Sequence, residues 1–139
     1  MDRKAKGTRG ERELVKLFNE AGWGCIRIAG SGSSRYPSPD ILAGNAIRRL
    51  AIECKVTAET KKYFPDDEIE QLRTFSQKFG AESWIGIHFP AEEWYFLMLE
   101  DLERTGTAWA ASLGDAKRKG LTIQELMGKE NNVPQNSLE

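Results

Sequence analysis

The 139-residue sequence has few of the side chains that build disulfide frameworks or zinc sites. Its two cysteines, Cys25 and Cys54, lie in apolar stretches without Cys-x-x-Cys spacing, and it has a single histidine, His88. This usage is more typical of reduced, buried thiols than of a secreted disulfide scaffold or a zinc site. Because His88 also lies in an apolar stretch, we expect it to pack in the core or at the surface and not to bind a metal.

Long apolar runs are also absent, since none approaches the roughly 20 residues that span a bilayer. The basic residues near the N-terminus are followed by no apolar core, unlike those of a secretory signal. Hydrophobic residues make up 40% of the chain and charged residues 29%, as in soluble globular proteins. We therefore expect a cytoplasmic protein with one domain over residues 1–128 and a disordered polar tail over residues 129–139.

Charge is distributed unevenly along the chain. Residues 1–65 contain 13 Lys and Arg against 7 Asp and Glu, whereas residues 66–139 contain 7 against 14. Clustered positive charge suggests a polyanionic partner, of which nucleic acid is the commonest. The alternative is a solvated charged surface without a partner, because most charge runs are only that.

The pattern of apolar residues predicts the element order α-β-β-β-α-β-β, followed by a short C-terminal helix, and thus an α/β protein. We expect the first helix to begin at Thr8 as its N-cap and to end at Gly22. Gly44 and Asn45 are expected to form a hairpin turn between two strands. The predicted helices are residues 8–22, 66–80 and 120–128, the predicted strands are 23–30, 40–44, 47–56, 83–89 and 93–100, and residues 31–39 are a predicted loop.

Two charged residues interrupt the most apolar of these strands. Successive side chains on a strand point to opposite faces, so Glu53 and Lys55 share one face. The other face carries Leu50, Ile52, Cys54 and Val56. Burying an unpaired ion is costly, so the polar face must be solvated, paired or functional. A modest surface salt bridge between Glu53 and Lys55 is the simplest alternative.

Asp40 favours a functional role for this face. It opens the preceding strand of the hairpin, and pairing of the two strands can bring it near Glu53. Two neighbouring carboxylates repel each other, and a cation such as Mg²⁺ relieves the repulsion through oxygen ligands. Lys55 can then orient the attacking water or balance the charge of a phosphate, as hydrolysis of a phosphodiester requires. The alternative is that Asp40 is only a turn residue.

Glu11 is a candidate third acid. It could form a capping box with Thr8, in which its carboxylate bonds to the helix N-terminus. Its spacing from Leu14 and Phe18 places it at the rim of the apolar helix face, so it can also point toward the sheet. Arg12 points away from that face and is expected to be a phosphate contact or a surface charge.

Other polar residues could contact a nucleic acid backbone. Ser31 ends the strand that leads into the site, where its hydroxyl could bond to a phosphate oxygen. A basic arm over residues 1–9 could extend a backbone-tracking groove. Nothing in these residues indicates base-specific recognition. The candidate basic residues are Arg3, Lys4, Lys6 and Arg9 of the arm, and Arg27, Arg35, Arg48, Arg49, Lys61 and Lys62.

Four segments in order, "GERELVKLFNEAGW", "RIAGSGSSRYPSPDILAGN", "LAIECKVT" and "EIEQLRTFSQKFGA", resemble the archaeal Holliday junction resolvases. These are homodimeric nucleases of the restriction-endonuclease-like fold. The resemblance implies a central mixed five-stranded sheet flanked by helices, together with a C-terminal helix. It extends over about residues 3–100, and the short helix over residues 120–128 also fits the family. Residues 104–120 follow no pattern that we can match.

The resemblance also implies a function. It implies a nucleoid-associated, Mg²⁺-dependent or Mn²⁺-dependent homodimer that cuts opposed strands of a four-way DNA junction. Glu11, Asp40 and Glu53 would hold the metal, Lys55 would assist the water, and Ser31 would lie near the scissile phosphate, while Arg12 and Arg27 would contact DNA. Docking on a sliding clamp or a recombinase is left open. The alternatives are a restriction-type or repair-type nuclease acting on linear duplex, a non-catalytic DNA-binding or assembly module, and an α/β protein that binds no nucleic acid.

Overall fold

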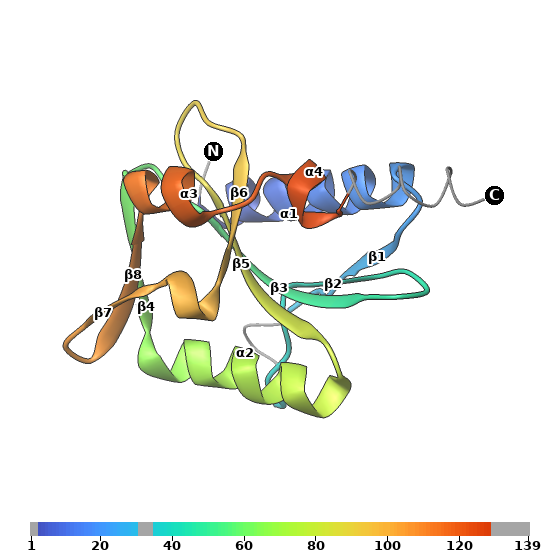
Figure 1. The fold of residues 1–139 in the computed structure, drawn as a ribbon, viewed down its shortest axis with the longest axis horizontal. Coiled ribbons are helices and arrows are strands. Elements are labelled where there is room, and N and C mark those ends of the chain that lie inside the picture. Colours follow the sequence, from blue (N-terminus) through green and yellow to red (C-terminus); the bar gives the residue numbers. More distant parts are fainter. Residues whose placement is uncertain (1–2, 31–34, 129–139) are drawn as a thin grey trace.

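A mixed five-stranded sheet forms the centre of the molecule in the computed structural model, which describes residues 3–30 and 35–128 (Figure 1). Its strand order is β1-β2-β3-β5-β6. β3 and β5 are parallel, and the other neighbouring strands are antiparallel. The strands are β1 (Gly24–Arg27), β2 (Ile41–Gly44), β3 (Arg49–Val56), β5 (Glu82–His88) and β6 (Trp94–Met98). This confirms the predicted α/β class and the mixed five-stranded sheet.

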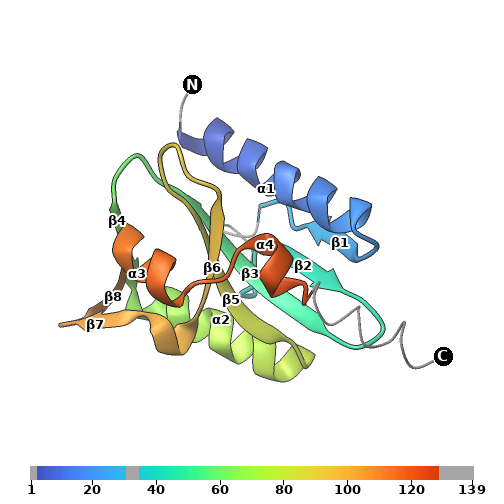
Figure 2. The same cartoon turned by 45° about the horizontal axis from the view of Figure 1, so that its top comes forward.

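Helices cover both faces of this sheet. Helices α1 (Arg3–Glu20) and α4 (Ile123–Leu126) lie on one face, and α2 (Asp66–Phe79) lies on the other (Figures 1 and 2). α2 ends at Gly80, whose positive φ of 82° is left-handed and whose N–H donates to the Ser76 carbonyl. The three predicted helices are therefore present, and the last one is short.

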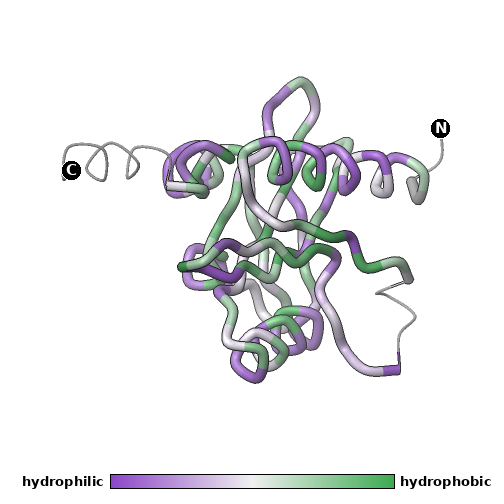
Figure 3. The backbone as a smooth tube through the Cα atoms, turned by 90° about the vertical axis from the view of Figure 1, so that its right-hand side faces the viewer, coloured by the Kyte–Doolittle hydropathy of each residue, from purple (hydrophilic) through white to green (hydrophobic). Residues whose placement is uncertain are grey.

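Each face of the sheet packs its own hydrophobic core. Leu14 and Phe18 of α1 pack with Leu50 and Ile52 of β3. On the opposite face, Ile69 and Leu72 of α2 pack with Ala51, Ile85, Ile87 and Leu97. Along the helices the backbone alternates between hydrophobic and hydrophilic residues, as expected for helices with one buried face (Figure 3). The alternation along β3 therefore places Leu50, Ile52 and Cys54 in the core under α1, as predicted, while Ala51 of the other face joins the second core.

A second sheet was not predicted. It has three strands in the order β4-β8-β7, and α3 (Leu113–Lys119) follows its last strand in the sequence. Its strands are β4 (Lys61–Pro65), β7 (Glu103–Thr105) and β8 (Ala108–Ser112), and a 3₁₀ turn (Leu99–Asp101) precedes β7. The predicted order α-β-β-β-α-β-β is thus wrong in omitting these elements. β4 pairs with a strand more than forty residues away, and such pairing depends on tertiary contacts that no local pattern reveals.

The start of the first helix was also wrongly predicted. α1 begins at Arg3, so residues 3–9 are its first turns and not a separate basic arm. Thr8 lies inside the helix and is not its N-cap, which removes the predicted capping box with Glu11. Instead, the Thr8 hydroxyl accepts a long hydrogen bond of 3.4 Å from Arg27. Gly10, the first buried residue of the described part of α1, lies directly against Val56 and Trp94.

Some predictions fall outside the described residues. They are the predicted role of Ser31 and the predicted disorder of residues 129–139. The side chains of Arg3 and Lys4 are not described either. No helix in the described ranges is both long and apolar enough to cross a membrane.

Candidate active site

Asp40 is placed beside Glu53 by the pairing of β2 with β3. Ile41, the first residue of β2, lies opposite Ile52, the residue before Glu53, and Asp40 directly precedes Ile41. The Asp40 N–H donates to the Ile52 carbonyl at 3.1 Å, and one Asp40 carboxylate oxygen, Oδ2, accepts from the Cys54 N–H at 2.8 Å. The predicted approach of these two acids is therefore present, and backbone contacts fix Asp40.

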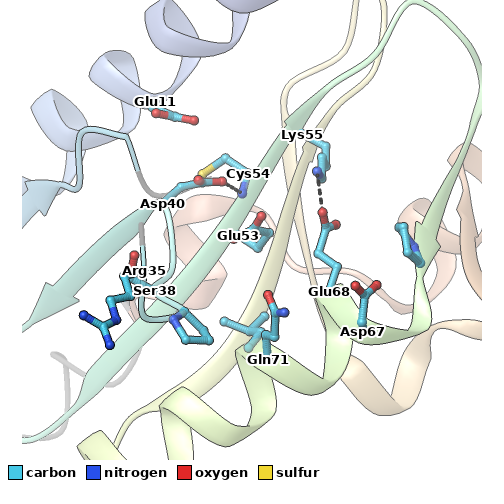
Figure 4. A pocket seen from close by; sticks show the side chains of 13 residues that line it. Glu11, Arg35, Ser38, Asp40, Glu53, Cys54, Lys55, Asp67, Glu68 and Gln71 are labelled. Atoms are coloured by element: carbon cyan, nitrogen blue, oxygen red, sulfur yellow. Dashed lines mark hydrogen bonds and ion pairs between the residues drawn. The ribbon is translucent and has the colours of Figure 1, made fainter. Parts of the chain in front are cut away.

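A cavity of about 580 Å³ opens where the polar face of β3 meets the first turn of α2. Glu53 and Lys55 line it from β3, Asp40 lines it from the start of β2, and Glu11 lines it from α1 (Figure 4). The remaining lining residues are Arg35, Pro37, Ser38, Cys54, Pro65, Asp67, Glu68, Gln71 and Leu72. The four predicted acidic and basic residues that the structure describes thus share one site.

Glu11 points toward the sheet and is paired with a cation. Its Oε1 accepts from Arg27 Nε at 2.9 Å, and the two side chains are 16% and 23% exposed. Burial raises the pKa of Glu11, and the nearby charge of Asp40 raises it further, whereas Arg27 lowers it. Arg27, predicted to contact DNA, is therefore also the electrostatic partner of this acid.

Lys55 is held by a residue that the sequence analysis did not include in the site. Its Nζ lies 3.1 Å from Oε2 of Glu68, in the first turn of α2. Burial lowers the pKa of Lys55, but the negative charges of Glu68 and Glu53 outweigh this and raise it overall. Lys55 is therefore a stable ammonium ion in the cavity.

The surroundings of Glu53 have an excess of negative charge. Burial, Asp40 and Glu68 together raise the pKa of Glu53 to about 8. Within the described ranges, no three acidic, thiol or imidazole side chains are already close enough to hold a metal ion. The donor set nevertheless fits a hard cation, because it consists of carboxylate oxygens whose mutual repulsion a cation would relieve.

The predicted basic residues are spread around the site. Arg35 lines the main cavity, and its guanidinium lies 5.6 Å from the centre of the Tyr36 ring. Lys6, Arg9 and Arg12 are exposed on α1. A smaller cavity of about 260 Å³ brings Lys6 together with Lys61 and Lys62. Of the described members of the predicted set, Arg35 thus lines the acidic cavity, Arg27 pairs with Glu11, and the others lie on α1 and β4.

Arg48 and Arg49 do not belong to this set. Arg48 makes two hydrogen bonds of 2.8 Å with Glu82 and donates to the Leu126 carbonyl at 2.6 Å. Arg49 donates to the Gly80 carbonyl at 3.0 Å. The suggestion that they line a DNA groove is therefore replaced by a structural role, in which both connect the β2–β3 turn to neighbouring elements.

Glu68 and Gln71 are the cavity residues that sequence reasoning missed most clearly. Asp66, Asp67 and Glu68 lie in the first turn of α2, where the helix dipole favours acids whether or not they have a further role. The spacing of Glu68 and Gln71, three residues apart, places them on one side of α2 and was an available signal. Ser38 also lines the cavity, and its buried hydroxyl has no hydrogen-bond partner among the described residues.

The sheet, its flanking helices and this cavity define a protein of the restriction-endonuclease-like fold. A family model described as "Archaeal holliday junction resolvase (hjc)" matches residues 2–134. The chain belongs to this family.

Named relatives support this assignment. The chain is 44% identical over 126 residues to the crossover junction endodeoxyribonuclease Hjc of Archaeoglobus fulgidus, covering 91% of this chain and 92% of the relative. It is 36% identical to the crossover junction endodeoxyribonuclease Hje of Saccharolobus solfataricus, covering 70% and 74% of the two chains. A solved structure of the Archaeoglobus Hjc, described as a Holliday junction resolvase, superposes with a TM-score of 0.81 at 42% identity, covering 87% of this chain and 98% of that one.

Proposed function

We propose that this protein is a structure-selective endodeoxyribonuclease that resolves four-way DNA junctions by metal-assisted phosphodiester hydrolysis. One observation carries the proposal: in a chain of this family, Glu11, Asp40, Glu53 and Lys55 come from three separate segments and meet in one cavity. The alternative of an incidental salt-bridge cluster accounts for the site less well. A cluster of that kind balances its charges, whereas burial, followed by the charges of Asp40 and Glu68, raises the pKa of Glu53.

The residues have distinct roles in this proposal. Asp40, Glu53 and Glu11 hold Mg²⁺, or Mn²⁺ in its place. When bound, such an ion lowers the pKa of a coordinated water and polarises the scissile phosphate. Lys55 orients the attacking water and balances the charge that develops on the phosphate. Ser31, outside the described residues, is expected to contact the same phosphate.

Junction selectivity would come from shape and from two copies of the site. The basic residues that flank the cavity follow phosphates and carry no base information. A two-fold homodimer would present two equivalent cavities to the two opposed strands of a roughly two-fold substrate. The protein would then act on DNA in the nucleoid, in the cytoplasm of the cell.

The decisive experiment compares substrates of equal sequence. A synthetic four-way junction and the matching linear duplexes are incubated with the protein and Mg²⁺, and the products are resolved by denaturing electrophoresis. We expect paired cuts in the junction and little cutting of the duplexes. Equal cutting of both substrates would favour a nuclease acting on linear duplex DNA.

Site variants test the chemistry separately from binding. Asp40→Asn and Glu53→Gln remove metal ligands, so they should lower junction cleavage by at least about a thousandfold while junction affinity stays within about threefold. Affinity is measured by gel shift in Ca²⁺. If Asp40→Asn cleaves the junction as the unchanged protein does, the proposed site is wrong. If the unchanged protein binds junctions without cutting them, it is a binding module.

A further inference from the structure

The contact between Lys55 and Glu68 joins two separate elements across the cavity. Lys55 lies on β3 and Glu68 on α2, and their charged atoms are 3.1 Å apart. The two side chains are 25% and 28% exposed, so solvent screens this pair less than a surface ion pair. Figure 4 shows the Lys55 side chain directed at Glu68, while Asp40 and Glu11 lie on the other side of the cavity.

Glu68 lies in a helical turn that contacts the second sheet through Asp66. Asp66, in the same helical turn, accepts from Arg104 of β7 at 2.6 Å and from Trp109 of β8 at 2.9 Å. The second sheet therefore anchors the first turn of α2. Glu68 Oε1 is buried without a hydrogen-bond partner among the described residues, so Oε2 is the oxygen that binds Lys55.

The position of Glu68 suits a carboxylate that orients the ammonium of Lys55. A lysine ammonium on a flexible stem has many rotamers, and a fixed carboxylate selects one of them. Besides Glu68, the acids whose charges act on the ammonium are Glu53 and Asp40. An ammonium bound there would compete with a cation for the same oxygens. Glu68 thus holds the charge of Lys55 close to the site and away from the proposed metal ligands.

We propose that Glu68 is a positioning residue for Lys55, and that the second sheet, through Asp66, holds Glu68 in place. Its kinetic consequence, an effect of Glu68 on the cleavage rate, rests on the proposed nuclease function. Its structural consequence, the restraint of the Lys55 ammonium, does not depend on activity. The two consequences are therefore measured independently.

The kinetic test is a double-mutant cycle measured under single-turnover conditions on the four-way junction with saturating Mg²⁺. Glu68→Gln should lower the cleavage rate roughly tenfold, because a half-buried charged contact is lost. In a Lys55→Ala background the same change should have no further effect, because its target is absent. Junction affinity in Ca²⁺ should be unchanged in both backgrounds.

Glu70→Gln is the matched control. Glu70 is a carboxylate on the same helix with an exposed ion pair, 3.6 Å from Arg73, and it does not line the cavity. Its replacement should leave the cleavage rate unchanged. Glu68→Asp, which keeps the charge but shortens the side chain, should give a rate between those of the unchanged protein and Glu68→Gln. Equal losses in the presence and absence of Lys55 would overturn the proposal, because Glu68 would then act on its own.

The structural test uses the chemical reactivity of the lysine. The protein without DNA or metal is treated with limiting acetic anhydride, and modification of Lys55 relative to exposed Lys78 is measured by mass spectrometry. Release of the ammonium in Glu68→Gln should raise this ratio at least about twofold. An unchanged ratio would overturn the positioning role. If no protein cleaves the junction but the ratio rises, the proposed function fails and the positioning role stands.

Discussion

Glu53 sits where burial and two neighbouring acids all oppose ionisation. Its carboxyl has a pKa of about 8 in the fold, against 4.5 for an ordinary glutamate. A pKa raised on folding means that the folded state binds the proton more tightly. The contribution of Glu53 to stability is then fully present below about pH 4.5 and is lost as the pH rises through about 8.

This gives a prediction about stability in the absence of metal. In EDTA, the melting temperature of the protein should fall between about pH 5 and pH 8, and the fall should be smaller in Glu53→Gln, which cannot ionise. Mg²⁺ should reduce the fall in the unchanged protein by neutralising the carboxylates. Differential scanning fluorimetry across this pH range measures both effects. Parallel pH profiles for the protein and Glu53→Gln would show that Glu53 ionises normally.

Asp40, Glu53 and Lys55 could be predicted from the sequence because strand alternation and hairpin register follow local rules. The pairing of Glu11 with Arg27 and that of Lys55 with Glu68 were not predicted. Each of these pairs joins two elements whose relative position is set by packing across the sheet. The individual acids were therefore predictable, but their partners were not.

Among the elements, α1 depends on a glycine for its approach to the sheet. A Cβ added to Gly10 would lie 2.9 Å from Cγ2 of Val56 and 3.0 Å from Cζ2 of Trp94. The Trp94 ring is 5% exposed, so it has little room to move. The next residue is Glu11, so the closeness of this contact also sets how near Glu11 comes to the cavity.

Gly10→Ala should therefore destabilise the protein despite the higher helix propensity of alanine. Overpacking costs about 1–3 kcal/mol, and the propensity gain offsets about 1 kcal/mol of this, so the free energy of unfolding should fall by about 1 kcal/mol. Gly7→Ala, in the same helix with open space around it, should raise this free energy by up to about 1 kcal/mol. Urea denaturation compares the two variants. Stabilisation by both changes would mean that α1 packs less closely than described.

The elements that sequence missed are the short strands of the second sheet. β7 has three residues and β4 and β8 have five each, and β4 pairs with a strand more than forty residues away. β1 and β2 are no longer, at four residues each, but glycine and polar segments mark their ends in the sequence. Residues 104–120, which matched no pattern, form part of the support for α2 through Arg104 and Trp109.

Over the whole molecule, the basic first half and the acidic second half of the chain do not occupy separate regions of space. The acidic second half contributes Asp67 and Glu68 to the cavity that Asp40 and Glu53 of the basic half also line. DNA affinity must then come from the basic residues flanking the cavity, because phosphates are repelled by its acids until a cation binds. This explains why net charge, at −1, says little about a nucleic acid partner.

An exposed apolar surface supports the proposed homodimer. Phe79, at the end of α2, is 48% exposed and stacks on Phe75 with ring centres 5.3 Å apart. Close to it in sequence, Ala81 lines a cavity of about 310 Å³ together with Trp84 and Met98, the last of which is 44% exposed. Phe79 and Met98 are exposed apolar side chains of the kind that contact surfaces between proteins bury.

We expect Phe79→Glu to convert the dimer to a monomer, because the introduced carboxylate would have to be buried without a partner in the interface. Size-exclusion chromatography with light scattering measures the mass of the assembly. The monomer should also lose paired cutting of the junction, since only one active site would be present in each particle. Ile47→Glu is the control, because Ile47 is 82% exposed at the β2–β3 turn, away from this cavity. A dimer that persists in Phe79→Glu but is lost in Ile47→Glu would place the interface at the β2–β3 turn.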